Sequence, residues 1–421
     1  MDQKQRERRN FFQNILITLL SFSAVLLFVA TQINVRESLF SSLPEANITS
    51  GTANSENDIS NVPVRVAVNS SYGRFGSVTL TTADESFAPL GSLLRDALDA
   101  APLPSPCSEQ EFYAALDGIS VYYDFLASLP LSILGNRIGA SGPDDISARY
   151  LTISAESGNV TLYLRNDAAE YFSCPTTLSA ENLETVISDY EQANTMFAYE
   201  AEQEYGAYAA SIHPLSLFLS DDLPSLPIFS AAKVLSGSSA LLSALSFNPY
   251  TQTRWTESSG TEVIVDGDRT LRFYSDGTLS YRSGGSNAVS ISTQQDLTLA
   301  ETARKAEQFL TQLLPVNSEA ELYLTGVSRT AASTVFTFEY HLNGIPIRFS
   351  NGESAAKITM IGSTVSSIFM SSREYQSSDS SALMLPLHQA LAIASKQPRA
   401  ELLLGYADYG DTQISPRWLC E

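Results

Sequence analysis

The sequence predicts an α+β protein in which antiparallel sheets carry packed helices, preceded by a single membrane-spanning helix at the N-terminus. Two observations support this expectation. Residues 10–35 contain no charged side chain and are largely apolar. After them, segments that alternate apolar and polar residues are mixed with segments of helical periodicity, and turn residues join several of the alternating segments into hairpins.

The uncharged segment is long enough to cross a bilayer as a helix. Because a helix rises about 1.5 Å per residue, roughly 20 residues span a hydrocarbon core of about 30 Å. Four basic and two acidic residues precede the segment, and this positive bias places the N-terminus in the cytoplasm. We therefore expect a cytoplasmic stub at 1–10, a signal anchor in the cell membrane at 11–33, and an extracytoplasmic remainder.

Two alternatives to the anchor stay open. A cleaved signal peptide has an apolar region of about 7 to 15 residues that ends at a small-x-small cleavage site. The segment here is longer, and Phe28–Gln32 offers no such site. The other alternative is a buried helix of a soluble domain. Because no later segment is comparably long and apolar, we expect a single-pass protein.

The composition excludes several classes of function. With 25 Lys and Arg against 46 Asp and Glu the net charge is −21, and the 21 basic and 44 acidic residues after position 10 give −23. Such a surface repels nucleic acids, which are bound through Lys and Arg. Three His and three Cys are too few for a His-rich metal centre, a zinc ribbon or a dense disulfide framework. We expect no nucleic-acid partner and no cofactor.

Changes in composition divide the extracytoplasmic part into four segments. Residues 34–62 are polar and lack periodicity, as in a flexible tether. A first α+β domain is predicted at 63–204. Three prolines within 205–235 prevent long helices, so this stretch is predicted to connect the first domain to a second α+β domain at 236–421.

The first domain combines predicted strands with predicted helices. Alternation of apolar and polar residues defines the strands, and apolar residues three and four positions apart define the helices. A turn at 156–159 joins two of the strands into a hairpin. The predicted strands are 62–68, 76–81, 119–125, 150–154 and 160–164, and the predicted helices are 88–98, 109–116 and 180–190.

The second domain contains the best-defined helix of the soluble part, at 297–314. Thr298 and Glu301 have the spacing of a capping box, an apolar stripe follows, and Pro315 ends the helix. The pairs Asp276-Gly277 and Asn343-Gly344 are expected to supply the positive φ angles of tight hairpin turns. The other predicted elements are a helix at 239–245, a helix between Pro386 and Pro398, a hairpin at 270–281, and strands at 262–265, 321–324, 335–340, 345–349, 356–361, 365–369 and 401–406.

The cysteines allow one predicted disulfide. Cys107 and Cys174 fall in the same predicted domain outside the membrane, where oxidation is possible. A bridge between them would stabilise the fold by about 4 kcal/mol in the chain-entropy model. Two unpaired buried thiols are the alternative. Cys420 is left without a predicted partner.

The sequence contains no recognised catalytic motif. His213 precedes a proline, His341 lies beside a hairpin turn and His388 lies in the last predicted helix. No nucleophile elbow, H-E-x-x-H, C-x-x-C or Gly-rich phosphate loop accompanies them. We therefore expect no enzymatic activity and no catalytic, cofactor-binding or metal-binding residues.

Acidic pairs and a group of tyrosines are the remaining candidates for binding. Carboxylates can hold calcium, but none of these pairs has the spacing of a known loop, so solvated turns explain them better. The tyrosines would line a binding surface or, more commonly, pack on a sheet. The acidic residues are Asp144, Asp145, Asp221, Asp222, Asp266, Asp268, Asp408 and Asp411, and the tyrosines are Tyr122, Tyr123, Tyr163, Tyr171, Tyr205 and Tyr208.

Several segments of the second half resemble the YycH/YycI family. They are Phe247–Tyr250, 260–281, Phe338–Pro346 and Tyr406–Trp418. Members of that family are single-pass proteins of low-GC Gram-positive bacteria whose extracytoplasmic domains regulate the essential cell-wall two-component histidine kinase. The resemblance covers the anchor and residues 238–421. It implies a membrane-embedded sensor kinase as partner, a paralogous regulator as a second candidate partner, and no catalytic residues.

We accordingly expect a non-enzymatic, membrane-anchored regulator that contacts the kinase through its span and its extracytoplasmic part. A span couples the two sides of the membrane only if it pairs with helices of the partner, and small or polar residues favour such packing. The expected pairing face is Ser21, Ser23, Ala24 and Thr31. The alternative is an extracytoplasmic binding module for wall fragments or peptides, for which the anchor is only a tether.

Overall fold

The computed structural model describes most of the chain after residue 62. All described residues belong to one compact unit, Ile59–Glu421. The predicted stub, anchor and tether, at 1–10, 11–33 and 34–62, lie outside them. Among the described helices, none combines the length and the apolar composition that a membrane span requires. The described residues are 63–70, 72–77, 87–101, 103–190, 194–219, 225–285, 288–294 and 296–421.

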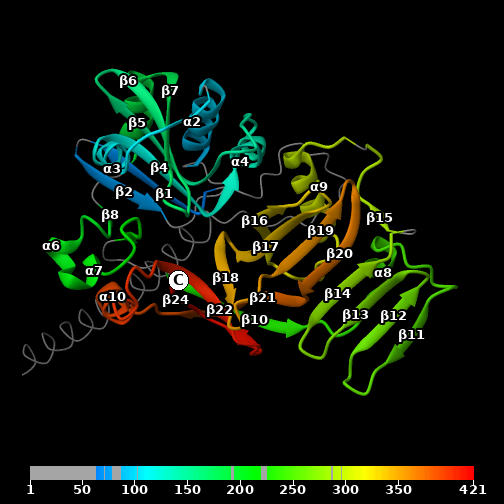
Figure 1. Cartoon of the computed structure of the whole chain (residues 1–421). Coiled ribbons are helices and arrows are strands. Elements are labelled where there is room, and N and C mark those ends of the chain that lie inside the picture. Colours follow the sequence, from blue (N-terminus) through cyan, green and yellow to red (C-terminus); the bar gives the residue numbers. More distant parts are fainter. Residues whose placement is uncertain are drawn as a thin grey trace, which may run out of the picture. The chain divides into compact units, whose positions relative to one another are not determined.

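Nine helices and mostly antiparallel sheets make up this described part, which confirms the predicted α+β class. Figure 1 shows the first of these sheets with helices beside it. Its seven strands pair antiparallel throughout, in the order β2 (Gly73–Ser77), β1 (Arg65–Ser70), β4 (Ile119–Pro130), β5 (Ser147–Glu156), β6 (Asn159–Arg165), β7 (Tyr171–Ser179) and β3 (Ser105–Pro106).

Helices cover both faces of the seven-stranded sheet. Side chains along strand β4 alternate between these two faces and are buried on each. Val121 and Tyr123 belong to the apolar cluster of α2 (Phe87–Ala100) and α5 (Ala180–Ser188). Tyr122 belongs to the cluster on the other face, with Phe112 of α3 (Glu109–Asp117). The Tyr123 hydroxyl also donates a hydrogen bond to the Leu90 carbonyl in α2 (2.8 Å). The predicted helices at 88–98, 109–116 and 180–190 are thus confirmed.

A twelve-stranded sheet dominates the second half. All its strand pairs are antiparallel except β18 with β22. Helices α8 (Ser239–Ala244) and α9 (Leu299–Thr311) contribute to the main apolar core with its strands. The strand order is β11 (Thr253–Thr256), β12 (Glu262–Asp266), β13 (Arg269–Phe273), β14 (Thr278–Ser283), β20 (Thr364–Ser371), β19 (Ala356–Ile361), β17 (Thr334–Leu342), β18 (Ile345–Phe349), β22 (Leu402–Asp408) and β24 (Pro416–Cys420), with β16 (Glu321–Arg329) on β17 and β15 (Val289–Ser290) on β20.

The capping box predicted for α9 is confirmed. The Thr298 hydroxyl accepts the backbone N–H of Glu301 (3.2 Å), and the Glu301 carboxylate accepts the backbone N–H of Thr298 (2.8 Å). Two otherwise unpaired N–H groups at the helix start are therefore satisfied.

The predicted hairpin turns are present, with one correction. Asn343 and Gly344 have φ angles of 51° and 78°, as a tight turn requires. In the other turn the positive φ of 94° belongs to Gly277, whereas Asp276 has no positive φ. Asp276 instead accepts the backbone N–H of Thr278 with its carboxylate (2.8 Å), because a short acidic side chain caps a turn two residues on.

The stretch predicted as a connection, 205–235, contains regular structure. Short helices α6 (Glu202–Tyr205) and α7 (Ala207–Ala210) precede β9 (Leu217–Leu219), which pairs with β8 (Thr195–Phe197). Next, β10 (Leu226–Lys233) lies between two strands from the end of the chain, β21 (Arg373–Ala382) and β23 (Gln413–Ile414). Helix α10 (Leu387–Ala394) shares a small apolar cluster with α7.

The two predicted domains share one apolar core. Helix α4 (Leu131–Ile138) contacts α9, and their residues Leu134 and Leu310 are fully buried in the same cluster. An ion pair between Arg137 of α4 and Glu307 of α9, both buried, lies at this contact. The two sheets are therefore packed as parts of one structure.

Candidate functional site

Four charged side chains, three of them buried and the fourth 12% exposed, meet where the two large sheets join. They are Arg65 on β1, Asp124 on β4, Arg149 on β5 and Glu401, which directly precedes β22. Arg65 pairs with both carboxylates, through Nε to Asp124 at 2.9 Å and through Nη2 to Glu401. Arg149 also pairs with both, through Nε to Asp124 at 2.9 Å and through Nη2 to Glu401 at 2.7 Å. We call these four residues the junction cluster.

The junction cluster is almost sealed from solvent. The side chains of Arg65 and Asp124 are 2% and 0% exposed. Burial opposes charge on Glu401, but the guanidinium groups of Arg65 and Arg149 outweigh it and hold the pKa of the carboxyl below its usual value. Burial likewise opposes charge on Arg65, and the two carboxylates raise the pKa of its guanidinium. The Glu401 carboxylate and the Arg65 guanidinium are thus held in their charged forms.

The apolar surroundings explain why these charges interact strongly. Val64, Leu126, Tyr323 and Leu403 form a separate buried cluster that includes residues of both sheets. The hydroxyl of Tyr323 on β16 donates to the Phe125 carbonyl on β4 (3.2 Å), which adds a direct bond between the sheets. With water excluded, removal of one charged partner leaves an uncompensated buried charge.

A histidine lies beside the junction cluster. The ring of His213 stacks on Tyr150 with centroids 6.1 Å apart, and the Arg149 guanidinium lies 4.6 Å from the Tyr150 ring centre. Burial, together with smaller effects of nearby arginines, lowers the pKa of His213 to about 4 against the opposing effect of Glu401. The imidazole is therefore neutral at physiological pH.

A cleft of about 670 Å³ adjoins the cluster through Asp167, which pairs with Arg149 at 3.4 Å. Burial raises the pKa of Glu339 in its wall to about 7. Glu339 Oε2 and Arg348 Nη1 are buried and have no hydrogen-bond partner among the described residues. We call this cleft the junction cleft. Its lining residues are Leu126, Ala127, Asp167, Thr325, Glu339, Arg348, Phe349, Gly352, Glu353, Tyr409, Arg417, Trp418, Leu419, Cys420 and Glu421.

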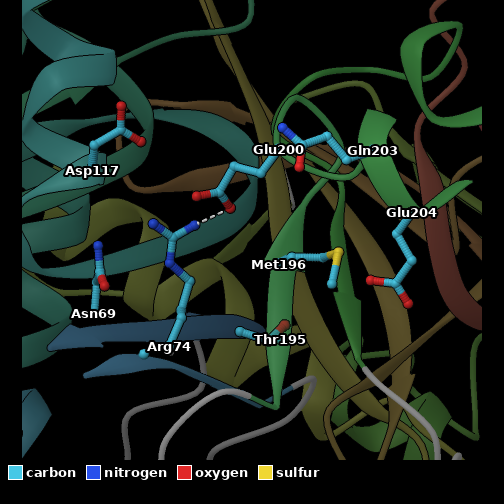
Figure 2. Close-up of a pocket in the computed structure, with 9 residues that line it drawn as sticks. Asn69, Arg74, Asp117, Thr195, Met196, Glu200, Gln203 and Glu204 are labelled. Atoms are coloured by element: carbon cyan, nitrogen blue, oxygen red, sulfur yellow. Dashed lines mark hydrogen bonds and ion pairs between the residues drawn. The ribbon is translucent and has the colours of Figure 1, made fainter. Parts of the chain in front are cut away.

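Figure 2 shows a second cleft, of about 620 Å³, at the β2 edge of the seven-stranded sheet. Arg74 of β2 points toward Glu200 and forms an ion pair with it. The Arg74 guanidinium also lies 4.5 Å from the ring centre of Phe197. Asp117 and Glu204 add two further carboxylates to the wall, so acidic groups outnumber the single arginine.

The three histidines are not brought together. Each contacts different aromatic residues: His213 contacts Tyr150, His341 stacks on Tyr323 at 4.2 Å, and His388 contacts Tyr205 and Tyr208. Burial lowers the pKa of His341 to about 3, whereas His388 is exposed on α10. Among the described residues, no group of three His, Cys, Asp or Glu side chains is arranged to hold a metal ion.

The predicted cysteines lie close to a pair of neighbouring strands: Cys107 directly follows β3, and Cys174 lies on β7. The backbone N–H of Cys107 donates to the carbonyl of Tyr171 on β7 (3.0 Å), three residues before Cys174. All three cysteines of the chain are free thiols in the structure. Burial raises the pKa of Cys107, and it raises that of Cys174 to about 11, which lowers the thiolate fraction needed for oxidation. The disulfide stays a prediction that a thiol count under denaturing, non-reducing conditions can test.

The predicted tyrosine group divides between core and surface. Tyr122 and Tyr123 are fully buried, whereas Tyr208 is 43% exposed. Tyr163, Tyr171 and Tyr205 are half-buried.

Two of the predicted acidic turns are not solvated. Asp408 is buried and accepts hydrogen bonds from Arg373 (2.9 Å) and from the Tyr375 hydroxyl (2.7 Å). Asp266 is buried with Arg269 and accepts the Asn248 N–H (2.9 Å). Hydrogen bonds from Asn248 and Thr251, together with Arg269, lower the pKa of Asp266. Asp221 and Asp222 lie outside the described residues, as do Ser21, Ser23, Ala24 and Thr31.

The junction cluster and Glu339 were not predicted from the sequence. Arg65 and Glu401 are 336 positions apart, and no local pattern relates them. The one local signal is Asp124, a charged residue within the otherwise apolar strand Ile119–Pro130. A charge inside a buried strand indicates a partner elsewhere in the fold.

Comparison with known proteins adds no relative. The chain matches no protein-family model, no curated protein and no solved structure.

Proposed function

We propose that this chain is a non-enzymatic, single-pass regulator, anchored in the cell membrane, whose extracytoplasmic part and span act on a two-component sensor histidine kinase. The observation that carries the proposal is the junction cluster. Its charged side chains contact one another and tie β1 to the residue before β22, instead of lining a pocket with a nucleophile. Such an arrangement suits a rigid body that presents surfaces to a partner.

The position of Arg65 in the sequence also supports the proposal. The predicted anchor and tether end at residue 62, and Arg65 is the first residue of the first described strand. The side chain that fixes this strand to both sheets therefore lies at the point where the folded part begins. The predicted pairing face of the span, Ser21, Ser23, Ala24 and Thr31, provides small and polar residues for contact with helices of the kinase.

The test uses the full chain in cells that contain the kinase. Residues 11–33 are replaced by an unrelated apolar span, and, separately, Ser21, Ser23, Ala24 and Thr31 are replaced by Leu. Either change should abolish co-purification with the kinase and alter kinase-dependent transcription. A control variant with Leu19→Ile, Val25→Ile and Leu27→Ile should behave as wild type.

Unchanged co-purification and transcription after the span exchange would contradict the proposal. That result would favour the alternative function, an extracytoplasmic binding module for wall fragments or peptides. The two clefts support this alternative, because each is large enough for a small ligand and has charged residues in its wall.

A further inference from the structure

In half of the twelve-stranded sheet, the side opposite α8 and α9 carries mostly exposed or half-buried side chains, with Val263 as a buried exception. From β11 to β19, residues such as Ile264, Leu271, Ile358 and Ile368 lie in one cross-strand row and are buried in the core with α8 and α9. Because side chains alternate along strands, their neighbours point to the other side. Figure 1 shows these strands side by side. We call this side the open face, and its exposed or half-buried members include Trp255, Arg272, Ser280, Arg282, Lys357 and Phe369.

The open face is basic, although the chain is strongly acidic. Arg272, Arg282 and Lys357 lie on it, and the residues that alternate with the core positions of β11 to β14, β19 and β20 include no Asp or Glu. In the part of the chain that the structure describes, none of these three cations has a carboxylate within ion-pair distance. Glu339 on the neighbouring strand β17 interacts with Lys357 at longer range.

This charge pattern contrasts with the rest of the molecule. After residue 10 acidic side chains outnumber basic ones by 44 to 21, and most arginines elsewhere pair with them. Three like charges on one sheet face repel one another, so the pattern costs stability unless an anion neutralises it.

The register fixes the spacing of these cations. Arg272, Ser280, Phe369 and Lys357 occupy one row across β13, β14, β20 and β19. Since neighbouring strands are about 4.8 Å apart, Arg272 and Lys357 are about 14 Å apart. Arg282 is diagonal to Arg272 on the next strand, about 7 Å away. A single small anion cannot reach all three, whereas an extended chain with repeated charges can.

The side chains between the cations favour phosphate. The guanidinium fork of arginine matches the oxygens of a phosphate group, and serine hydroxyls such as that of Ser280 can donate to them. Trp255, 44% exposed, and Phe369 offer apolar surface for the uncharged links of such a chain. We propose that the open face binds an extended polymer that carries phosphate groups along its length. This inference does not depend on the proposed action on a kinase.

The test measures binding of the purified full chain to long-chain polyphosphate, in a bilayer mimic and at several salt concentrations. If three cations make contact, the logarithm of the affinity should fall with the logarithm of salt with a slope of about −2. The variant R272Q/R282Q/K357Q should bind at least about tenfold more weakly at low salt and lose most of that slope. The matched control R95Q/K305Q/K396Q removes three cations outside the open face and should bind as wild type.

The proposal would be overturned by no binding by the wild type, by equal weakening in both triple variants, or by an unchanged salt slope in R272Q/R282Q/K357Q. Competition decides the kind of ligand. Inorganic phosphate at the same phosphate concentration should not displace the polymer, because it cannot span the row. Stronger binding of polyglutamate than of polyphosphate would show that an acidic peptide, and not a phosphate polymer, is the ligand.

Discussion

Glu401 is the residue of the second half of the chain that joins the junction cluster. Its carboxylate pairs with both Arg65 and Arg149 in the first half. Asp124 holds the same two guanidinium groups from the first half. The cluster therefore balances two positive and two negative charges in a site that excludes water, and each member stabilises the fold only while its partners remain charged.

Glu401→Gln should lower the free energy of unfolding by about 3 kcal/mol at pH 7, because it leaves two buried guanidinium groups with one carboxylate. Denaturant unfolding of the full chain measures the change. Since the arginines lower the pKa of Glu401, its contribution is present above the ordinary carboxyl pKa and is lost as pH falls below about 4. The difference between variant and wild type should therefore shrink at pH 3. A difference that stays constant between pH 7 and pH 3 would contradict this explanation. Replacement of the exposed Glu353 by Gln serves as the control.

Glu339 should show the opposite dependence on pH. Burial raises its pKa from 4.5 to about 7, so the folded state holds a proton that the unfolded state has already lost between these values. The contribution of this protonation to the stability of the fold is favourable at low pH and disappears as pH rises toward 7. The side chain in Glu339→Gln stays neutral. At pH 8 the free energy of unfolding of this variant should therefore be about 2 kcal/mol higher than that of wild type. The two proteins should be equally stable at pH 4, and a variant that is less stable at pH 8 would refute this explanation.

Elements with a strong local signal could be predicted from the sequence. Helix α9 was predicted from its capping box and apolar stripe, and the hairpin of β17 and β18 from Asn343 and Gly344. Strands β10 and β21 were missed, because their stability comes from pairing with distant segments. β21 is rich in serine, and among its residues Tyr375 and Arg373 supply the buried contacts with Asp408.

The cap of α9 provides a test at the level of one element. Thr298→Ala removes the hydroxyl that accepts the Glu301 N–H and should cost about 1 kcal/mol of stability. Thr298→Ser keeps the hydroxyl and should stay within a few tenths of a kcal/mol of wild type. Thermal unfolding of both variants measures the difference. Equal losses in the two would mean that the methyl group, and not the cap, matters at this position.

For the whole molecule, the sequence predicted the class of the fold and none of the junction cluster. The net charge predicted an acidic surface, but not that half of one sheet face would lack carboxylates. Both features depend on which strands become neighbours, and that arrangement is decided by packing across hundreds of residues. The proposed regulator accordingly combines a rigid extracytoplasmic body with a span whose side chains make the contact with the partner.

Photocrosslinking from the span of the full chain in its native membrane shows which proteins the span contacts. A photoreactive residue is placed at Ser21, and the crosslinked proteins are identified by mass spectrometry. The account predicts a crosslink to a sensor histidine kinase, and its loss when Ser23, Ala24 and Thr31 are replaced by Leu. Crosslinks to lipid alone, or to proteins that include no kinase, would contradict it.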